Sequence, residues 1–571
     1  MRLLHYSMEH RADYPWQFVT GNTCMLRLRC NEPVRSIRIV FGDPFWFLNG
    51  DKRRPNLHTL PVTDKTTLLG DTFYSVTVKM ETQKLRYHFE IVLESGEKVF
   101  LSEAGVTEPL SEEHLRPFQV PYVFPAEHYA APGWARGTVW YQIFPDRFSR
   151  DDESESTEKF IPTRKNRFGG TLQGIENHIP YLKLLGVQGV YLNPIFQSPS
   201  NHRYDTADYT RIDPMLGTEE NFASLVHALH ENGMRIMLDG VYNHASWQHP
   251  FWQDVLKNGE KSAYFDWFCG VDMESLRGKT PEELMADEMR AIKPFESFAF
   301  AADMPKWNTE NPAVQNYLIG TAAEWTRKYG IDAWRLDVPD EVSFRFLEKF
   351  KKSIRDVNPE EAYILGEIWQ KSTPWLCAGV FDGVMDYPLY FAIRDFAMTG
   401  ADGTETFAER IKDILLAAPD GVRPWQFAFC GNHDIPRPLT VCSWDTNRLA
   451  AALFLQMLLG GAASVYYGDE LGMSGGEDPL NRGAMAWGEP DEKIKALYVS
   501  MIGFKKEHRD GLNITEMRMQ DGVLCLTLSG GDCMAYIAEP GGNKHIAAPD
   551  GMRLRFGDTS LECGYAFFEK K

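Results

Sequence analysis

Acidic side chains stand at the ends of five predicted strands in the middle of the sequence. They belong to the segments Asp239–His244, Trp334–Asp337, Gly366–Trp369, Gly431–Asp434 and Gly468–Glu470. A single acid after a strand usually caps the following helix. Five such acids on one set of parallel strands would meet at one mouth of a barrel, which favours catalysis by carboxylates.

Two of these acids, Asp337 and Glu367, follow neighbouring strands. Carboxylates about 5–5.5 Å apart cleave glycosidic bonds with retention: one attacks the anomeric carbon, and the other protonates the leaving oxygen and later activates water. Arg335 points to the same side of its strand as Asp337. We expect its charge to keep Asp337 ionised, although a structural salt bridge is equally compatible. Glu367 precedes Ile368 and Trp369, and an apolar setting suits a proton donor.

The strands that must position these acids are short, continuous apolar runs, which is typical of strands buried on both faces. Helical segments separate them, most clearly at Thr218–Asn232, Pro312–Tyr329 and Asp445–Leu459. This alternation predicts an α/β fold, a (β/α)8 TIM barrel, with a doubly wound open sheet as the alternative. The eight predicted strands are Val139–Phe144, Gly189–Leu192, Arg235–Leu238, Ala333–Leu336, Tyr363–Leu365, Gly383–Met385, Gln426–Phe429 and Ser464–Tyr467.

Strand-like runs with period two flank the barrel. Residues 1–124 are expected to form an N-terminal β-sandwich and residues 511–571 a C-terminal β-domain. Residues 125–510 are expected to hold the barrel. The connection after its third strand is too long for a simple loop, so we expect a small inserted domain at about 245–303.

The composition excludes several classes of partner. A formal net charge of −19 argues against nucleic acid and anionic membranes, which attract basic proteins. The nine cysteines contain no CxxC pair, which favours a reducing compartment. No signal peptide and no run of 18 apolar residues is recognisable, so we expect a cytoplasmic protein.

Several segments resemble a known family, both in residues and in order. They are DGVYNH at 239–244, MPKWN at 304–308, AWRLDV at 333–338, LGEIW at 365–369 and GNHD at 431–434. The chain resembles the α-amylase superfamily, glycoside hydrolase family 13, and within it the cyclomaltodextrinase, maltogenic amylase and neopullulanase group. The resemblance implies retaining hydrolysis of α-1,4 bonds in cyclodextrins, maltooligosaccharides or pullulan, with α-1,6 bonds left open.

The resemblance also implies the roles of individual residues. Asp337 would be the nucleophile, Glu367 the proton donor, and Asp434 the stabiliser of the oxocarbenium-like sugar. Residues expected to bind or orient the reacting glucose are Tyr204, His244, Arg335, His433, Asp478 and Arg482.

The N-terminal region resembles a family 34 carbohydrate-binding module, on the segment FGDPFWF at 41–47. This likeness implies a homodimer formed through the N-terminal domain and a preference for short or cyclic oligosaccharides. Trp46 is either a contact at the rim of the active site or an ordinary core residue.

The sequence departs from the family at two places. Arg150, Ser156 and Thr171 stand where many relatives carry oxygen ligands for calcium, so we expect no cofactor and no metal. Pro339 and Asp340 replace the usual Ala-Asn pair, which leaves the preference for the leaving group open.

Two alternatives to a hydrolase of linear or cyclic α-glucans remain. A glucanotransferase or a branched-oligosaccharide hydrolase would use the same carboxylates, because one glycosyl-enzyme is intercepted by either water or sugar. A non-catalytic sugar-binding homologue belongs to another class. It is disfavoured because the chain keeps all three acids.

Overall fold

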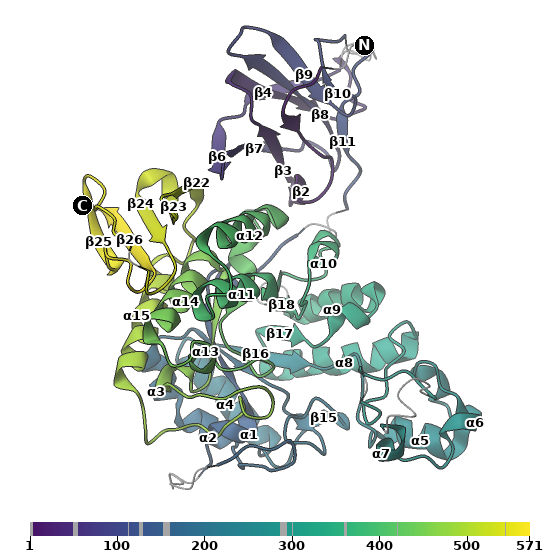
Figure 1. Ribbon diagram of the computed structural model, residues 1–571. Helices are drawn as coiled ribbons and strands as arrows, with labels where there is room; N and C mark the ends of the chain where they lie inside the picture. Colours follow the sequence, from purple (N-terminus) through teal and green to yellow (C-terminus); the bar gives the residue numbers. More distant parts are fainter. Residues whose placement is uncertain are drawn as a thin grey trace.

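The structure is a computed structural model of the chain. It describes residues 4–48, 55–111, 114–124, 129–151, 160–285, 294–299, 301–358, 362–419, 421–542 and 544–571. Strands dominate both ends of the chain, and alternating strands and helices form the middle (Figure 1). No helix within these ranges is long and apolar enough to cross a membrane.

The central sheet is a closed barrel of eight parallel strands. Its strands are β12 (Val139–Ile143), β13 (Gly189–Leu192), β16 (Arg235–Gly240), β17 (Ala333–Leu336), β18 (Tyr363–Gly366), β19 (Gly383–Val384), β20 (Phe427–Phe429) and β21 (Ala462–Tyr466). They pair in sequence order, and a parallel bridge between Met385 and Phe427 closes the ring. The predicted (β/α)8 TIM barrel is therefore confirmed, and the open sheet is excluded.

Side chains from the barrel strands pack on two sides. Trp140, Tyr191, Met237, Tyr363 and Phe427 belong to one buried cluster that draws on strands all around the barrel. The side chains that alternate with them pack outward against the surrounding helices in the largest core of the protein. Burial on both faces explains why the strands are apolar throughout.

Local signals in the sequence set the helix ends. Thr218 and Asn221 form a capping box at the start of α4 (Glu219–Glu231), and α8 (Pro312–Tyr329) ends at Gly330, whose φ is +70°. The other barrel helices are α1 (Pro145–Phe148), α2 (Leu172–Asn177), α3 (Ile179–Leu185), α9 (Phe344–Val357), α10 (Thr373–Cys377), α11 (Tyr387–Ile393), α12 (Thr404–Ala417), α13 (Pro438–Val441), α14 (Thr446–Leu459) and α15 (Glu492–Glu507).

A small insertion follows the third barrel strand, β16. It contains α5 (Pro250–Asn258), α6 (Met273–Leu276) and α7 (Pro281–Leu284), which lie beside one end of α8 (Figure 1). Isolated bridges pair Ser297 with Pro305 and His244 with Lys306. These bridges tie the end of the insertion back to the loop that leaves β16.

The N-terminal strands form two facing sheets. One contains β4 (Val34–Gly42), β5 (His58–Pro61), β8 (Leu85–Leu93), β9 (Lys98–Ser102), β10 (Gly105–Thr107) and β11 (Phe118–Val120). The other contains β1 (Met8–Glu9), β2 (Gln17–Thr20), β3 (Thr23–Cys30), β6 (Asp64–Leu68) and β7 (Asp71–Lys79). Leu26 and Leu28 on β3 pack with Ile39 and Phe89 from the facing sheet in one core, which makes this part a β-sandwich.

The last five strands do not form a separate sheet. They are β22 (Ile514–Gln520), β23 (Val523–Leu528), β24 (Cys533–Ile537), β25 (Met552–Gly557) and β26 (Tyr565–Lys570). β22 pairs in parallel with β6, so that Thr67 lies opposite Glu516 and Leu68 opposite Met517. One ten-stranded sheet therefore joins the N-terminal and C-terminal parts of the chain.

Candidate active site

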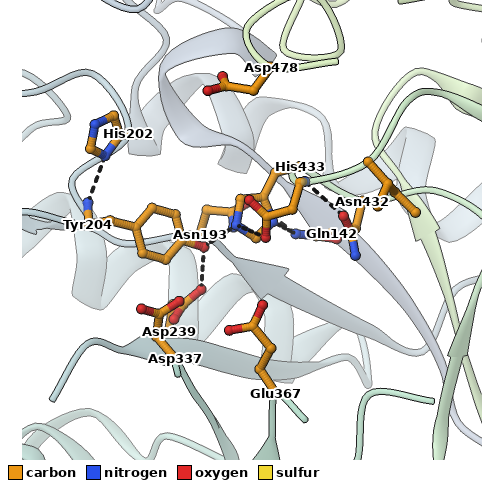
Figure 2. A network of polar contacts seen from close by, with 12 residues as sticks. Gln142, Asn193, His202, Tyr204, Asp239, Asp337, Glu367, Asn432, His433 and Asp478 are labelled. Carbon is orange, nitrogen blue, oxygen red and sulfur yellow. Dashed lines mark hydrogen bonds and ion pairs between the residues drawn. The ribbon is translucent and has the colours of Figure 1, made fainter. Parts of the chain in front are cut away.

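A cavity of about 640 Å³ opens at the carboxyl ends of the barrel strands. Every site residue predicted from the sequence lines it except Arg335, which is fully buried and contacts the carboxylates that line it. Figure 2 shows Tyr204, Asp337, Glu367 and His433 around one space, with Asp478 on its far side. The residues that line the cavity and were predicted are Tyr204, His244, Asp337, Glu367, His433, Asp434, Asp478 and Arg482.

Arg335 is shared by three carboxylates. Its Nη1 lies 2.7 Å from Asp337 Oδ1 and 2.8 Å from Asp239 Oδ1, and its Nη2 lies 2.9 Å from Glu367 Oε2. Asp239 also accepts hydrogen bonds from the hydroxyls of Tyr191 and Tyr204, at 2.6 and 2.8 Å. One fixed guanidinium thus sets the positions of both predicted catalytic carboxylates.

Opposing effects act on the pKa of Asp337. Burial raises the pKa of Asp337 well above its ordinary value, and the nearby carboxylates of Glu367 and Asp239 raise it further, against the lowering effect of Arg335. Arg335 favours the ionised form of Asp337, in the direction expected, but its one positive charge is divided among three buried acids. The cluster of three carboxylates around Arg335 therefore tends to retain a proton.

Four groups contact the carboxylate of Glu367. Oε2 faces Arg335 and accepts a hydrogen bond from the backbone N–H of Val338 at 3.1 Å. Oε1 accepts from Trp369 Nε1 at 3.1 Å and from the hydroxyl of Tyr387 at 3.5 Å. Val338 has a φ of +43°, which is unusual for a β-branched residue and turns its N–H toward Glu367.

Asp434 belongs to a chain of charges on the other wall of the cavity. Its carboxylate lies 3.3 Å from Arg482 and 3.0 Å from His433 Nε2. Arg482 also contacts Asp478 at 3.1 Å, and Asp478 contacts Arg164 at 3.4 Å. Burial raises the pKa of Asp434, and Arg482 opposes that shift.

Tyr204 and the two predicted histidines form a neutral, hydrogen-bonded wall. The rings of Tyr204 and His433 are parallel, with centroids 5.1 Å apart. Gln142 Nε2 lies 3.0 Å from His433 Nδ1, which leaves Nε2–H to donate to Tyr204 at 2.5 Å. Burial lowers the pKa of His244 to about 3 and that of His433 well below its ordinary value. Both imidazoles are therefore neutral at ordinary pH, and each donates its one N–H within the protein: His433 to the hydroxyl of Tyr204, and His244 to the main-chain carbonyl of Tyr204 at 3.1 Å.

The site contains residues that sequence reasoning missed. Tyr387 follows the sixth strand, β19, where no acid had marked a strand end. Asn432 lies inside the GNHD segment but was not assigned a role. Phe298 and Met304, from the insertion, line the cavity, and the ring of Phe298 stacks on His244 at 4.9 Å. For Phe298 the signal was the length of the connection after the third strand, whereas Met304 begins the MPKWN segment.

Comparison with known proteins agrees with this geometry. Residues 142–513 match the family described as "Alpha amylase, catalytic domain", and residues 4–124 match "Alpha amylase, N-terminal ig-like domain". The chain belongs to the alpha-amylase family. It is a glycosidase that acts on α-glucans with retention, the mechanism general to this family.

Individual relatives resemble the chain over most of its length. A cyclomaltodextrinase of Geobacillus thermopakistaniensis is 38% identical over 516 residues, which cover 88% of this chain and 84% of the relative. An intracellular maltogenic amylase of Bacillus subtilis is 36% identical, over 84% of this chain and 81% of its own. A solved cyclomaltodextrinase superimposes with a TM-score of 0.80 at 30% identity, covering 98% of this chain and 99% of that one.

Proposed function

We propose that the protein hydrolyses α-1,4-glucosidic bonds of cyclodextrins and short maltooligosaccharides, with Asp337 as nucleophile and Glu367 as acid/base. The observation that carries this proposal is the sharing of Arg335 at the floor of the cavity. Asp337 faces one terminal nitrogen of that guanidinium and Glu367 the other. Two carboxylates that share one guanidinium lie close together, which suits a retaining pair.

The reaction has two steps. Asp337 Oδ attacks the anomeric carbon while Glu367 gives its proton to the glycosidic oxygen, so an ester forms and the acceptor-side sugar leaves. A water molecule then attacks the same carbon, Glu367 takes its proton, and the ester bond to Asp337 breaks. Asp434 stabilises the positive charge that develops on the sugar in both steps.

The neutral wall of the cavity suits an uncharged sugar. Tyr204 offers an apolar ring face, the uncharged rings of His244 and His433 line the same cavity, and Asp478 and Arg482 can hydrogen-bond hydroxyls of the reacting glucose. The names of the relatives support cyclodextrins and maltooligosaccharides as substrates. Initial rates on β-cyclodextrin, maltotriose, pullulan and starch test this choice, and starch cleaved faster than cyclodextrin would contradict it.

The catalytic pair has its own test. Asp337→Asn and Glu367→Gln should each lower hydrolysis of β-cyclodextrin by roughly 10⁴-fold or more, because each removes a group that makes or breaks a bond. With an α-maltosyl fluoride, whose leaving group needs no proton, Glu367→Gln should still form the ester on Asp337 and accumulate it. Intact mass spectrometry detects that adduct. Wild-type rates in either variant would overturn the assignment.

We also propose that the enzyme works as a homodimer inside the cell. Apolar side chains are exposed on the N-terminal sandwich, including Phe45 (72% exposed) and Trp46 (47%), which suits a protein contact. All nine cysteines are free thiols, in keeping with a reducing compartment. The name of the Bacillus subtilis relative places that protein inside the cell.

We propose that the enzyme needs no calcium. Arg150 donates from Nε to the carbonyl of Phe168 at 2.9 Å, and its guanidinium lies 4.3 Å from the ring of Phe168. Thr171 caps α2 by accepting from Gly174 N. A guanidinium does not fit beside a cation, so these residues do not suit calcium. Ser156 lies outside the described residues.

A further inference from the structure

A chain of hydrogen bonds reaches Glu367 from the end of the seventh strand. Asp434 N donates to Asn432 Oδ1 at 2.8 Å. Asn432 Nδ2 donates to the hydroxyl of Tyr387 at 3.2 Å, and that hydroxyl lies 3.5 Å from Glu367 Oε1. Asn432 and Tyr387 are both fully buried, so these contacts are shielded from bulk water.

The direction of this chain follows from its first bond. Asp434 N can only donate, so the amide oxygen of Asn432 must face it. The Asn432 amide nitrogen therefore faces Tyr387 and donates a hydrogen bond to the hydroxyl oxygen of that tyrosine. The hydroxyl proton of Tyr387 is left to point at Glu367. All three donors thus point toward Glu367, and hydrogen bonds aligned in this way strengthen one another.

The other three groups that contact Glu367 can only donate hydrogen bonds, whether its carboxyl group is ionised or protonated. Arg335, the Val338 N–H and Trp369 Nε1 are obligatory donors, whereas the hydroxyl of Tyr387 can donate or accept. Trp369 also stacks on the ring of Tyr387, at 3.9 Å and 17°, which fixes the tyrosine beside the carboxylate. We call the chain of hydrogen bonds from Asp434 N through Asn432 and Tyr387 the relay. It fixes the direction of the one hydrogen bond to Glu367 whose donor could also accept.

We propose that Tyr387 and Asn432 are positioning residues that orient the carboxylate of Glu367 and supply a hydrogen bond to it while it acts as the base that activates water in the second step. This inference rests on the proposed role of Glu367. The two residues need not touch the sugar, because they act through Glu367. Their effect should therefore fall on the water-dependent half of the reaction.

The test uses the full-length enzyme with Tyr387→Phe, which keeps the ring and removes only the hydroxyl. The ionised form of Glu367 loses a donor, so the alkaline limb of the kcat/KM profile on β-cyclodextrin should move to higher pH by about half to one unit. With α-maltosyl fluoride, kcat should fall about 10-fold while kcat/KM stays within about twofold, because only breakdown of the ester needs the base.

Tyr387→Phe leaves the other titratable side chains around Glu367 in place. A shift of the pH profile can therefore be assigned to the lost hydroxyl. The charged or titratable groups that interact with Glu367 or Tyr387 are Tyr191, Arg335, Asp337 and Asp434, and Asp239 shares Arg335 with Glu367. Tyr390→Phe is the matched control. It removes a buried hydroxyl from the same helix, α11, where the ring packs on Phe429 away from Glu367. We expect it to leave both profiles as in wild type.

Asn432→Leu removes the other member of the relay. It should move the alkaline limb in the same direction as Tyr387→Phe, and the double variant should move it no further than the larger single shift, since both act on one path. An alkaline limb that stays in place, or equal losses on both substrates, would overturn the relay. Glu367→Gln separates the two proposals, because activity that survives it would refute the role of Glu367 itself.

Discussion

Arg335 is one guanidinium that contacts three buried acids, Asp239, Asp337 and Glu367. The resulting surplus of negative charge affects how the site holds protons. A site with surplus negative charge retains a proton, and the first half of glycoside cleavage needs a protonated acid beside an ionised nucleophile. The raised pKa of Asp337 expresses the same surplus. Because the protons of such a cluster belong to the group as a whole, the pH profile of the enzyme reports its total charge.

Asp239→Asn tests this description. It removes one negative charge beside Asp337 and leaves Arg335 to be shared by two carboxylates, so the pKa of Asp337 should fall. As the proposed nucleophile, Asp337 must be ionised to attack, so we expect activity to be lost as pH falls through its pKa. The acid limb of kcat/KM should therefore move to lower pH, by about one unit.

The measurement is a pH series on β-cyclodextrin under conditions where the variant stays folded. Asp213→Asn is a suitable comparison, because Asp213 is also buried beside an arginine, Arg203, outside the cavity. It should leave the acid limb unchanged. An acid limb of Asp239→Asn that moved to higher pH would contradict the shared-charge description.

At the scale of elements, the insertion after β16 is needed to complete the cavity. Phe298 lies on its returning segment, lines the cavity and stacks on His244. Its main-chain N–H donates to Met304 O at 3.0 Å, which holds the segment in place without the ring. The aromatic ring is therefore free to serve binding.

Phe298→Ala should raise KM for β-cyclodextrin by about 10-fold or more, because an apolar surface that would meet the sugar is lost. We expect kcat to change less than threefold, since Phe298 touches no catalytic carboxylate. Steady-state kinetics measure both. Phe251→Ala, in the same insertion but stacked on Tyr264 outside the cavity, should lower Tm without changing KM. A fall in kcat with constant KM would contradict a binding role for Phe298.

The segment after β12 gives a prediction about metal. Among the described residues, no three His, Cys, Asp or Glu side chains gather around a possible metal position. Because Arg150 bonds to Phe168, excess EDTA and excess calcium should both leave Tm unchanged. Binding at 100 times Kd would add about 2.7 kcal/mol, which scanning calorimetry resolves easily. A rise in Tm with calcium but not with magnesium would refute the prediction.

The elements differ in how well the sequence predicts them. The barrel strands are continuous apolar runs, so Val139–Phe144 corresponds closely to β12 and Ala333–Leu336 matches β17. The acids were identifiable because five of them follow strands of one predicted barrel and would therefore meet at one mouth. Tyr387 was not, since a tyrosine near a strand end fits a core equally well. Its position beside Glu367 depends on contacts across three strands, which no local pattern encodes.

At the scale of the whole molecule, the N-terminal sandwich presents an apolar surface. Phe45, Trp46, Leu48 and Leu60 are exposed on it, between 39% and 72%. Such a surface is costly in water unless another protein covers it. The resemblance of this region to a module that pairs subunits led us to propose a homodimer.

The dimer prediction is tested by sedimentation equilibrium at micromolar concentration. The wild type should have twice the 65.2 kDa mass of one chain, and a Phe45→Ser/Trp46→Ser variant should have the mass of one chain. Leu554→Ser removes an exposed apolar residue near the C-terminus and should leave the dimer intact. A wild type that sediments as a single chain would contradict the prediction.

The sheet that joins the N-terminal and C-terminal domains could not be predicted from the sequence, because nothing in β6 or β22 indicates that the two strands pair. β6 reads Asp-Lys-Thr-Thr-Leu, a polar strand with no sign of its neighbour. The strand propensity of a segment predicts that it forms a strand, but it does not predict which other strand it pairs with. The parallel pairing with β22 joins positions near the two ends of the chain, so only the complete fold reveals it.

This pairing imposes an order on synthesis. The sandwich leaves the ribosome first, and its β6 edge must wait for β22 until almost the whole chain has been made. During that interval the backbone N–H and C=O groups at this edge of β6 are unpaired and can form hydrogen bonds with a strand of another chain. The polar side chains of β6, Asp64 and Lys65 among them, are the kind that discourage such encounters. A chain cut short before residue 514 would keep that edge uncovered for its whole lifetime.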